Sequence, residues 1–265
     1  MKLICLNVAL FEANNNLVSS FLKKQHADFI CLQEITRGLE NSVDKKYISK
    51  DAVDKTTPNL NHFFFGPNSI MGNFEQINFH GKEVYKFEFG GLMEFGNYTK
   101  SKYKIVKAQT IFVQNSFTFT TDQSNWPDED YRSVLITDHS IEGKALRILN
   151  YHGVWTRNKL GNEKSLIANK IINDLALQAK GAVIICGDFN LFPHTSSMKL
   201  FEKNFTSLVD VHNIKTTRPS TNELHHVGRN VVDYIWISKG VKVKDFRVIE
   251  SHVSDHLPLI LDFKL

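Results

Sequence analysis

Amide, carboxylate and imidazole side chains stand where apolar, strand-like segments of this sequence end. These residues are Asn7, Glu34, His152, Asp188 and Asn190. Because ligands of α/β proteins collect at the carboxyl ends of strands, a shared sheet edge would bring these side chains into one cleft. The set is rich in oxygen atoms, which suit Mg²⁺ or Mn²⁺ rather than zinc.

Three further polar residues lie in the C-terminal part of the chain. Asp233 stands near the start of a predicted strand, and Asp255 and His256 directly precede another. A hard cation beside a carboxylate and a histidine can hydrolyse a phosphoester. The metal offsets charge on phosphorus, the carboxylate orients or deprotonates water, and the histidine contacts a phosphoryl oxygen. These residue types therefore predict metal-assisted phosphoester hydrolysis.

Each residue also has a purely structural interpretation. A carboxylate at a strand end, such as Glu34, is more often solvated, and a lone histidine such as His152 is more often structural. The segment 187–190 has the composition of a turn. It is the joint occurrence of these residues that favours a site.

Two segments share one order of elements: strand, helix, short turn, buried strand, acidic residue. The first comprises strand 3–6, helix 17–22 with cap candidates at 14–16, and strand 29–32; the second comprises strand 147–149, helix 165–180 and strand 183–186. Gly181 is expected to end the second helix. We interpret the two segments as related halves of a layered α/β fold.

The rest of the chain has weaker periodicity. Apolar runs between Gly, Asn and Pro residues predict strands at 62–65, 84–89, 105–113, 117–120, 231–237, 246–249 and 257–263. A helix is predicted after Pro193, and the polar stretch 36–60 predicts a surface excursion. We expect a single domain over residues 1–265, because no linker or low-complexity segment interrupts the sequence.

Composition sets broad limits on function. The 265 residues are 42% hydrophobic and 23% charged, which excludes a disordered chain. The net charge of +4 permits an anionic partner such as nucleic acid. No apolar run approaches the roughly 18 residues of a membrane span. Cys5, Cys31 and Cys186 lie in strand-like runs without a Cys-x-x-Cys pair. This favours a reducing compartment, so we expect a cytoplasmic protein, although a chain trimmed of a leader would look the same.

Four blocks of the sequence together resemble the signature of a known superfamily. They are Cys31-Leu32-Gln33-Glu34-Ile35, Gly187-Asp188-Phe189-Asn190-x-x-Pro193, Asp233-Tyr234-Ile235 and Ser254-Asp255-His256-Leu257-Pro258. In this order they resemble the endonuclease/exonuclease/phosphatase superfamily, which has the DNase-I-like fold. The resemblance spans Met1 to Phe263 and is weakest over residues 36–130. It implies a four-layered α/β sandwich of two packed, mostly antiparallel mixed sheets flanked by helices. It also implies Mg²⁺-dependent hydrolysis of phosphoesters, with Mn²⁺ as a possible substitute.

The resemblance implies metal ligands and a water-orienting group. Glu34 resembles the main metal ligand of the family, with Asn7 beside it, and Asp255 resembles a further carboxylate near the metal. Asp188 is similar to the carboxylate that orients or deprotonates the attacking water. Asn190 resembles its partner in holding water and phosphate.

The resemblance also implies groups that contact the phosphoryl group. His152 resembles a histidine that contacts the scissile phosphate in many members. His256 resembles the histidine that stabilises pentavalent phosphorus, and Asp233 resembles the carboxylate that orients its imidazole. A carboxylate-paired histidine keeps its charge and orientation better than a free one.

Two positions bear on the substrate. Ala9 stands where many DNA-repair members carry an acidic residue, which lowers the case for an abasic-site endonuclease. The run 152–157 resembles the His-x-x-x-Thr-Arg run of tyrosyl-DNA phosphodiesterases. Arg157 is therefore a candidate phosphate contact, and a solvated loop arginine is an equally good interpretation.

Basic and aromatic residues alternate in two places. The first strip comprises Tyr98, Lys100, Lys102, Tyr103 and Lys104, and the second comprises Trp155, Arg157 and Lys159. Such strips can stack bases and neutralise phosphates, although ordinary solvated strand faces look the same. The working hypothesis is a monomeric nuclease or nucleotidyl phosphodiesterase with a phosphoester substrate, nucleic acid first, and no stable membrane association.

Other functions remain open at this point. The phenylalanine-rich segments 63–65 and 74–95 could form an apolar wall for a phosphatase or lipid phosphodiesterase of inositol-phosphate or sphingomyelin type, but core sheet explains them better. A binding module that has lost catalysis is the alternative from another class, and the joint presence of the polar set speaks against it. His225 and His226 resemble a metal site, yet neighbouring strand residues point to opposite faces. We expect them in a loop facing substrate or solvent.

Overall fold

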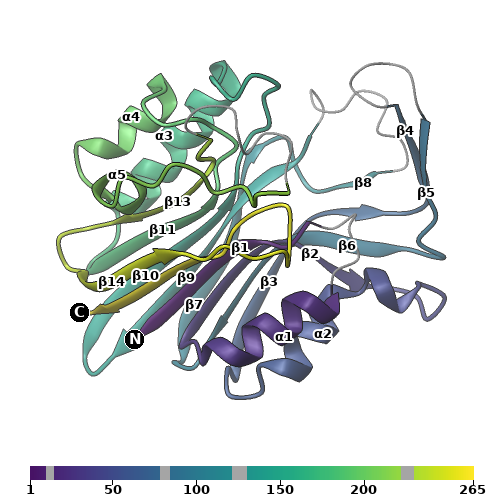
Figure 1. Ribbon diagram of the computed structural model, residues 1–265, viewed down its shortest axis with the longest axis horizontal. Helices are drawn as coiled ribbons and strands as arrows, with labels where there is room; N and C mark the ends of the chain where they lie inside the picture. The colour runs from purple at the N-terminus through teal and green to yellow at the C-terminus, as the bar shows by residue number, and fades with distance from the viewer. Residues whose placement is uncertain (10–14, 78–83, 121–129, 222–229) are drawn as a thin grey trace.

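A computed structural model describes residues 1–9, 15–77, 84–120, 130–221 and 230–265. Two mixed β-sheets pack face to face, and helices cover their outer faces (Figure 1). This arrangement confirms the predicted four-layered fold class. His225 and His226 lie outside the described residues.

The first sheet contains both chain termini. Its strands are β1 (Lys2–Asn7), β2 (Phe29–Gly38), β3 (His62–Met71), β6 (Met93–Ser101), β8 (Thr118–Thr120), β14 (Lys242–Val248) and β15 (Leu259–Lys264). Their order is β14-β15-β1-β2-β6-β3-β8. The N- and C-terminal ends lie side by side, because Met1 and Phe263 exchange two main-chain hydrogen bonds of 2.8 Å (Figure 1).

The second sheet carries the other half of the sandwich. Its strands are β7 (Ile105–Gln114), β9 (Arg132–Ile141), β10 (Lys144–His152), β11 (Ala182–Asp188), β12 (Thr206–Ser207) and β13 (Asp233–Ile237), in the order β12-β13-β11-β10-β9-β7. Strands β4 (Phe74–Ile77) and β5 (Val84–Phe87) pair in a separate hairpin. Most strand pairs in the two large sheets are antiparallel.

Helices form the two outer layers. One layer holds α1 (Asn15–Gln25), the 3₁₀ helix η2 (Lys45–Tyr47) and α2 (Ser49–Thr56), and the other holds α3 (Glu163–Leu177), α4 (Ser196–Glu202) and α5 (Leu208–Val211). Figure 1 shows these layers on opposite sides of the sandwich. No helix in the described part of the chain is long and apolar enough to cross a membrane.

Strand β1 is apolar throughout because it is buried on both faces. Leu3 and Cys5 belong to the large core cluster between the sheets. Ile4 and Leu6 face the other way and pack with Val18 and other residues of α1. This double burial explains a continuous apolar run where a half-exposed strand would alternate.

The two repeated segments of the sequence form two parallel strand–helix–strand units. Strand β1 pairs in parallel with β2, with Asn7 opposite Gln33. Strand β10 pairs in parallel with β11, with His152 opposite Asp188. The predicted repetition is therefore confirmed, with one unit in each sheet, and each unit ends in polar residues.

Helix α3 ends earlier than predicted. It begins at a capping box formed by Asn162 and Ser165, and it ends at Leu177 with Gln178 as the cap. Gly181 is not the helix cap. A Cβ at this position would lie 2.3 Å from the main-chain oxygen of Ala145, so glycine is required by the close approach of β10.

Segment 36–60 is part of the helical layer and not the surface excursion that its polarity predicts. Strand β2 continues to Gly38, and η2 and α2 follow it. Val53 of α2 is buried against the first sheet. Asp54 accepts hydrogen bonds from the Tyr98 hydroxyl at 2.6 Å and from Lys100 Nζ at 2.9 Å. These contacts fix α2 on β6.

His139 in β9 makes the stability of the fold depend on pH. Its Nε2 lies 3.0 Å from Thr137 Oγ1, its ring packs edge-on against Phe29, and burial lowers its pKa to about 4. An unfolded histidine has a pKa of about 6.5, so the unfolded chain binds more protons between these values. We expect the contribution of His139 to be complete above about pH 6.5 and to be lost as pH falls toward 4, by about 3 kcal/mol in all. Urea unfolding at pH 7.5, 5.5 and 4.5 measures it.

The matched control is His139→Gln, which keeps a polar side chain that does not titrate in this range. The free energy of unfolding of this variant should depend less steeply on pH between 6.5 and 4 than that of the parent protein. Equal slopes for the two proteins would show that His139 is not the group responsible.

Candidate active site

The polar residues predicted from strand ends meet where the two parallel units face each other. Asn7 ends β1, His152 ends β10 and Asp188 ends β11, while Glu34 lies in β2. The Asn7 amide joins the sheets: its Nδ2 donates to Glu34 Oε1 at 3.0 Å and to Asp188 Oδ2 at 3.2 Å. The structure therefore brings these predicted side chains together at one place.

Glu34 reaches the site through an irregularity in β2. The register with β6 shifts between Leu32 and Ile35, and Glu34 has a φ of 60°. In a regular strand, Gln33 and Glu34 would point to opposite faces. The bulge lets Gln33 stay fully buried between the sheets while Glu34 turns to Asn7.

Asp188 is held in place by a glycine and by Asn190. Gly187 has a φ of 145°, and a Cβ there would lie 1.8 Å from the main-chain oxygen of Tyr151. The main-chain N–H of Asn190 donates to Asp188 Oδ1 at 2.8 Å. Asn190 Nδ2 lies 3.3 Å from both Asp188 Oδ2 and the main-chain oxygen of Gly153. The turn-like segment thus fixes one carboxylate with two donors.

His256 and Asp233 form a buried pair. His256 Nδ1 lies 2.9 Å from both carboxylate oxygens of Asp233, and Nε2 lies 3.6 Å from Asp188 Oδ2. The loop before β15 is positioned by Ser254, whose hydroxyl donates to the main-chain oxygen of Asn7 at 2.7 Å. The imidazole therefore presents Nε2 toward the centre of the site.

The charges around the His256–Asp233 pair favour a state in which the two side chains share one proton at neutral pH. Burial and Arg218 lower the pKa of His256, but Asp233, Asp255 and Asp188 outweigh them and raise it to about 9. Burial also raises the pKa of Asp233, against the opposing effect of His256. Since His256 holds its proton until about pH 9, we describe the pair as an imidazolium beside a carboxylate.

Asp188 and His152 have pKa values shifted down for different reasons. Burial raises the pKa of Asp188, yet the positive charges of His256 and Arg218 outweigh it and hold the value below the usual range. Burial and Arg132 lower the pKa of His152 well below its ordinary value. Asp188 is therefore ionised and His152 neutral near pH 7.

His152 approaches the same Asp188 oxygen as His256. Its Nε2 is 3.7 Å from Glu34 Oε1 and 3.8 Å from Asp188 Oδ2. Its ring meets that of Phe95 edge-on, at 6.4 Å between centroids. A neutral imidazole here can donate a hydrogen bond without adding charge.

The oxygen donors of the site suit a divalent cation. Asp188, Asp233 and His256 lie close enough to share an ion, but Asp233 already accepts from His256 through both oxygens. Glu34 and Asp188 converge on one amide, where a cation would offset their repulsion. Asp255 borders the same region, with Oδ1 3.8 Å from His256 Nε2. Glu34 and Asp188 could therefore hold a cation, with Asp255 beside His256.

Asn7 is oriented differently from a metal ligand. Its Oδ1 accepts from the main-chain N–H of Ala9 at 3.0 Å, so its nitrogen faces Glu34 and Asp188. A metal ligand would have to present its oxygen. In this arrangement, Asn7 aligns two carboxylates.

The sequence matches a known protein family over almost its whole length. The model of the Endonuclease/Exonuclease/phosphatase family matches residues 4–256. The chain belongs to this family. Members of the family are phosphoester hydrolases that generally use divalent metal ions. No curated protein matches the sequence.

Solved structures of family members share the fold at low sequence identity. An endonuclease/exonuclease/phosphatase from Beutenbergia cavernae DSM 12333 is 15% identical, with a TM-score of 0.70 over 100% of this chain and 71% of that chain. A humanized D. rerio TDP2 is also 15% identical, with a TM-score of 0.69 over 100% and 99%. The mannosyl-6-phosphatase Bt3783 of Bacteroides thetaiotaomicron VPI-5482 is 11% identical, with a TM-score of 0.64 over 100% of both chains.

The interpretation of residues 98–104 as an exposed basic aromatic strip is wrong. Tyr98 and Lys100 are buried on β6, where both contact Asp54. Only Lys102 and Lys104 of its lysines are exposed. The charged and hydroxyl groups of this strand stabilise α2, so they cannot bind a nucleic acid there.

The second basic aromatic strip has one residue at the surface and one in the site. Arg157 is exposed on the loop after β10. Lys159 is buried, and its Nζ donates to Asn190 Oδ1 at 2.6 Å. Lys159 reaches the predicted site directly, which its place in an apparently solvated loop did not indicate.

Arg218 is a site residue that sequence reasoning missed. Its Nη1 donates to the main-chain oxygen of Asp255 at 3.1 Å and to Asp255 Oδ2 at 3.0 Å. Its charge also lowers the pKa values of His256 and Asp188. Thr217-Arg218-Pro219 follows no strand-end pattern, so spacing gave no signal for it.

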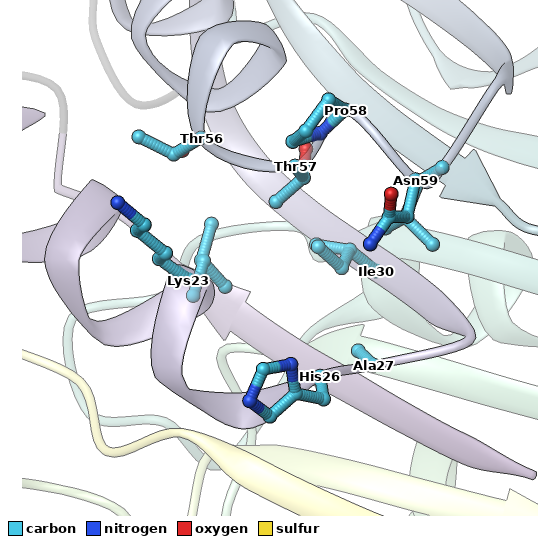
Figure 2. Close-up of a pocket in the computed structure, with 10 residues that line it drawn as sticks. Lys23, His26, Ala27, Ile30, Thr56, Thr57, Pro58 and Asn59 are labelled. Carbon is cyan, nitrogen blue, oxygen red and sulfur yellow. The ribbon is translucent and has the colours of Figure 1, made fainter.

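A separate hollow of about 50 Å³ lies on the outer face of the first sheet. Figure 2 shows Lys23 and His26 of the α1 end facing the segment Thr56 to Asn59 across it. Its lining contains no carboxylate and no residue of the predicted site. We therefore assign no chemistry to it.

The charge on His256 should depend on Asp233. In Asp233→Asn, burial and Arg218 would be opposed only by Asp255 and Asp188, so we expect the pKa of His256 to fall from about 9. Histidine ¹H–¹⁵N NMR on metal-free protein measures this shift, with His256→Gln to assign the signal. A change of less than about one unit would show that Asp233 is not the dominant partner.

Proposed function

We propose that this chain is an Mg²⁺-dependent phosphodiesterase, with Mn²⁺ as a substitute, acting as one domain on nucleic acid or nucleotidyl substrates. The observation that carries the proposal is the arrangement around Asp188. An imidazolium on His256, held by Asp233, and a neutral imidazole on His152 lie 3.6 and 3.8 Å from Oδ2 of Asp188. This carboxylate is ionised and shares the Asn7 amide with Glu34. This set can hold a phosphoryl group, a water molecule and a cation at once.

Each residue has a role that fits its charge. Asp188 would accept a hydrogen bond from the attacking water and orient it, because its low pKa makes it a weak proton acceptor. His256 would donate from Nε2 to a phosphoryl oxygen whose negative charge grows in the transition state. The neutral His152 and the Asn190 amide would donate to the same group. Mg²⁺ held by Glu34, with Asp188 and Asp255 nearby, would supply charge that offsets the developing negative charge.

Support for a nucleotidyl substrate comes from the loop after β10. Trp155 and Arg157 lie on this loop beside the site, where an aromatic ring can stack on a base and a guanidinium can bind phosphate.

A phosphomonoesterase is the second candidate. The site holds Lys159 and Arg218 in addition to the charged His256, which favours a substrate phosphate with more than one negative charge. The likeness to a mannosyl-6-phosphatase points the same way. By contrast, Phe63 of the suggested apolar wall is exposed on β3 and packs under Lys50 of α2, so it gives no support to a lipid substrate.

Metal removal and substrate choice are tested together. We expect the protein with Mg²⁺ or Mn²⁺ to hydrolyse a chromogenic phosphodiester faster than its monoester, and EDTA to abolish turnover because no protein group replaces the cation charge. Steady-state rates before and after EDTA, with metal added back, measure this. A monoester preference would select the second candidate, and EDTA-resistant turnover would contradict the metal dependence.

We expect the loss of kcat on substitution to distinguish the catalytic residues from residues outside the site. Asp188→Asn and His256→Gln should each lower kcat by about 10²- to 10⁴-fold, because each removes a group that contacts water or phosphoryl oxygen. His225→Ala is the control, and its activity should stay within about tenfold of the parent protein. Similar losses in all three variants would overturn the ranking and the assignment of the site.

A further inference from the structure

Two lysines are buried in the described part of the chain, and their surroundings differ. Lys100 is 3% exposed, and its Nζ lies 2.9 Å from Asp54 Oδ1 and 3.3 Å from the main-chain oxygen of Thr57. Lys159 is 8% exposed, and its Nζ has one hydrogen-bond acceptor, Asn190 Oδ1 at 2.6 Å. Lys100 therefore has the carboxylate partner that a buried ammonium requires, and Lys159 contacts a neutral amide instead.

The remaining contact of the Lys159 ammonium is an aromatic face. Nζ lies 4.5 Å from the centroid of the Trp155 ring. Within the described residues, this Nζ forms no ion pair with a carboxylate. A cation–π contact and one amide oxygen compensate only part of the cost of burying an ammonium.

The wider electrostatic surroundings do not remove that cost. Asp188 and Asp233 attract the Lys159 charge, while Arg218 and Arg132 repel it. Burial is the largest influence and lowers the pKa of Lys159 to about 7. The amine is therefore only partly protonated near neutral pH, and an anion bound beside it would favour the ammonium form.

The loop is built to keep this side chain in place. Lys159 has a φ of 56°, and its main-chain N–H donates to the oxygen of Thr156 at 3.1 Å. Its main-chain oxygen accepts from the N–H of Phe192 at 2.8 Å, which joins the loop to the segment after Asn190. A solvated loop lysine would need neither a left-handed backbone nor this tie.

We propose that Lys159 is a further substrate-binding residue, whose ammonium contacts the phosphoryl group of the substrate and fixes the Asn190 amide toward Asp188. The inference rests on the proposed function, since it places the phosphoryl group beside Asp188. By accepting from Lys159, Asn190 Oδ1 is turned away from Asp188, and Nδ2 is left to donate to Asp188 Oδ2. One side chain therefore supplies charge to the substrate and orients a neighbouring donor.

The test compares Lys159→Met with Lys100→Met and Lys170→Met. Methionine keeps the length and the packing of the alkyl chain and removes the charge. Lys170 is exposed on α3, so its variant controls for the change in net charge. The readouts are the affinity for inorganic phosphate by calorimetry, kcat and KM on the chromogenic ester, and Tm.

We expect Lys159→Met to bind inorganic phosphate about 10- to 100-fold more weakly, as for the loss of a charged hydrogen bond. Its kcat/KM should fall by at least that factor, with kcat falling as well as KM rising because Asn190 loses its orientation. Its Tm should stay unchanged or rise, because an incompletely compensated buried charge is gone. Lys100→Met should lower Tm, since it leaves Asp54 without its partner, and Lys170→Met should change none of the readouts.

Other outcomes separate this inference from the proposed function. Phosphate affinity within about twofold of the parent protein in Lys159→Met would overturn the inference, as would a lowered Tm with unchanged affinity, which marks a structural lysine. Failure of the parent protein to bind phosphate would overturn it too. If the parent protein hydrolyses neither ester but binds phosphate through Lys159, the binding role stands and the proposed hydrolase function fails.

Discussion

A pair of buried amides, Gln33 and Asn150, ties the two sheets together next to the site. Gln33 Nε2 donates to Asn150 Oδ1 at 2.6 Å, and Asn150 Nδ2 donates to two main-chain oxygens of the first sheet at 3.1 Å each. Displacing either amide would leave buried polar groups without hydrogen-bond partners, and each such group would lower the stability of the fold by about 1–3 kcal/mol. A purely apolar interface tolerates sliding, whereas this pair favours one alignment of β2 with β10. That alignment brings Glu34, next to Gln33, near His152, two residues beyond Asn150.

Given that alignment, the neighbours of each histidine decide its charge. His256 faces the carboxylate of Asp233 and remains protonated, whereas His152 is buried near Arg132 and remains neutral. One fold thus presents a charged and a neutral imidazole to the same oxygen of Asp188. Such a division suits a phosphoryl group, because the charged donor can act where negative charge grows and the neutral one can position without excess charge.

The sequence predicts the parts of this structure that local chemistry determines. Strands buried on both faces are visible as apolar runs, and the polar residues that end them mark the site. Strand β6 was missed because Lys100 and Tyr98 are polar, yet they are buried through Asp54, a partner more than forty positions away. The same limit applies to Lys159, whose burial depends on Asn190 across the site. Tertiary partners of this kind leave no local pattern.

Four of the nine non-glycine residues with positive φ in the described part of the chain lie at or beside the site. Ala9, Glu34, Lys159 and Asn190 all have φ values between 55° and 60°, a region that residues with a Cβ rarely adopt. Each is held by contacts that a relaxed backbone would lose: Ala9 to Asn7, Glu34 through the bulge in β2, and Lys159 to Asn190. Strain of this kind persists only where the surroundings over-determine it. The sandwich therefore does more than support the site, because its packing holds four backbone positions in conformations that direct the Glu34, Lys159 and Asn190 side chains, and the Ala9 main-chain N–H, to their partners.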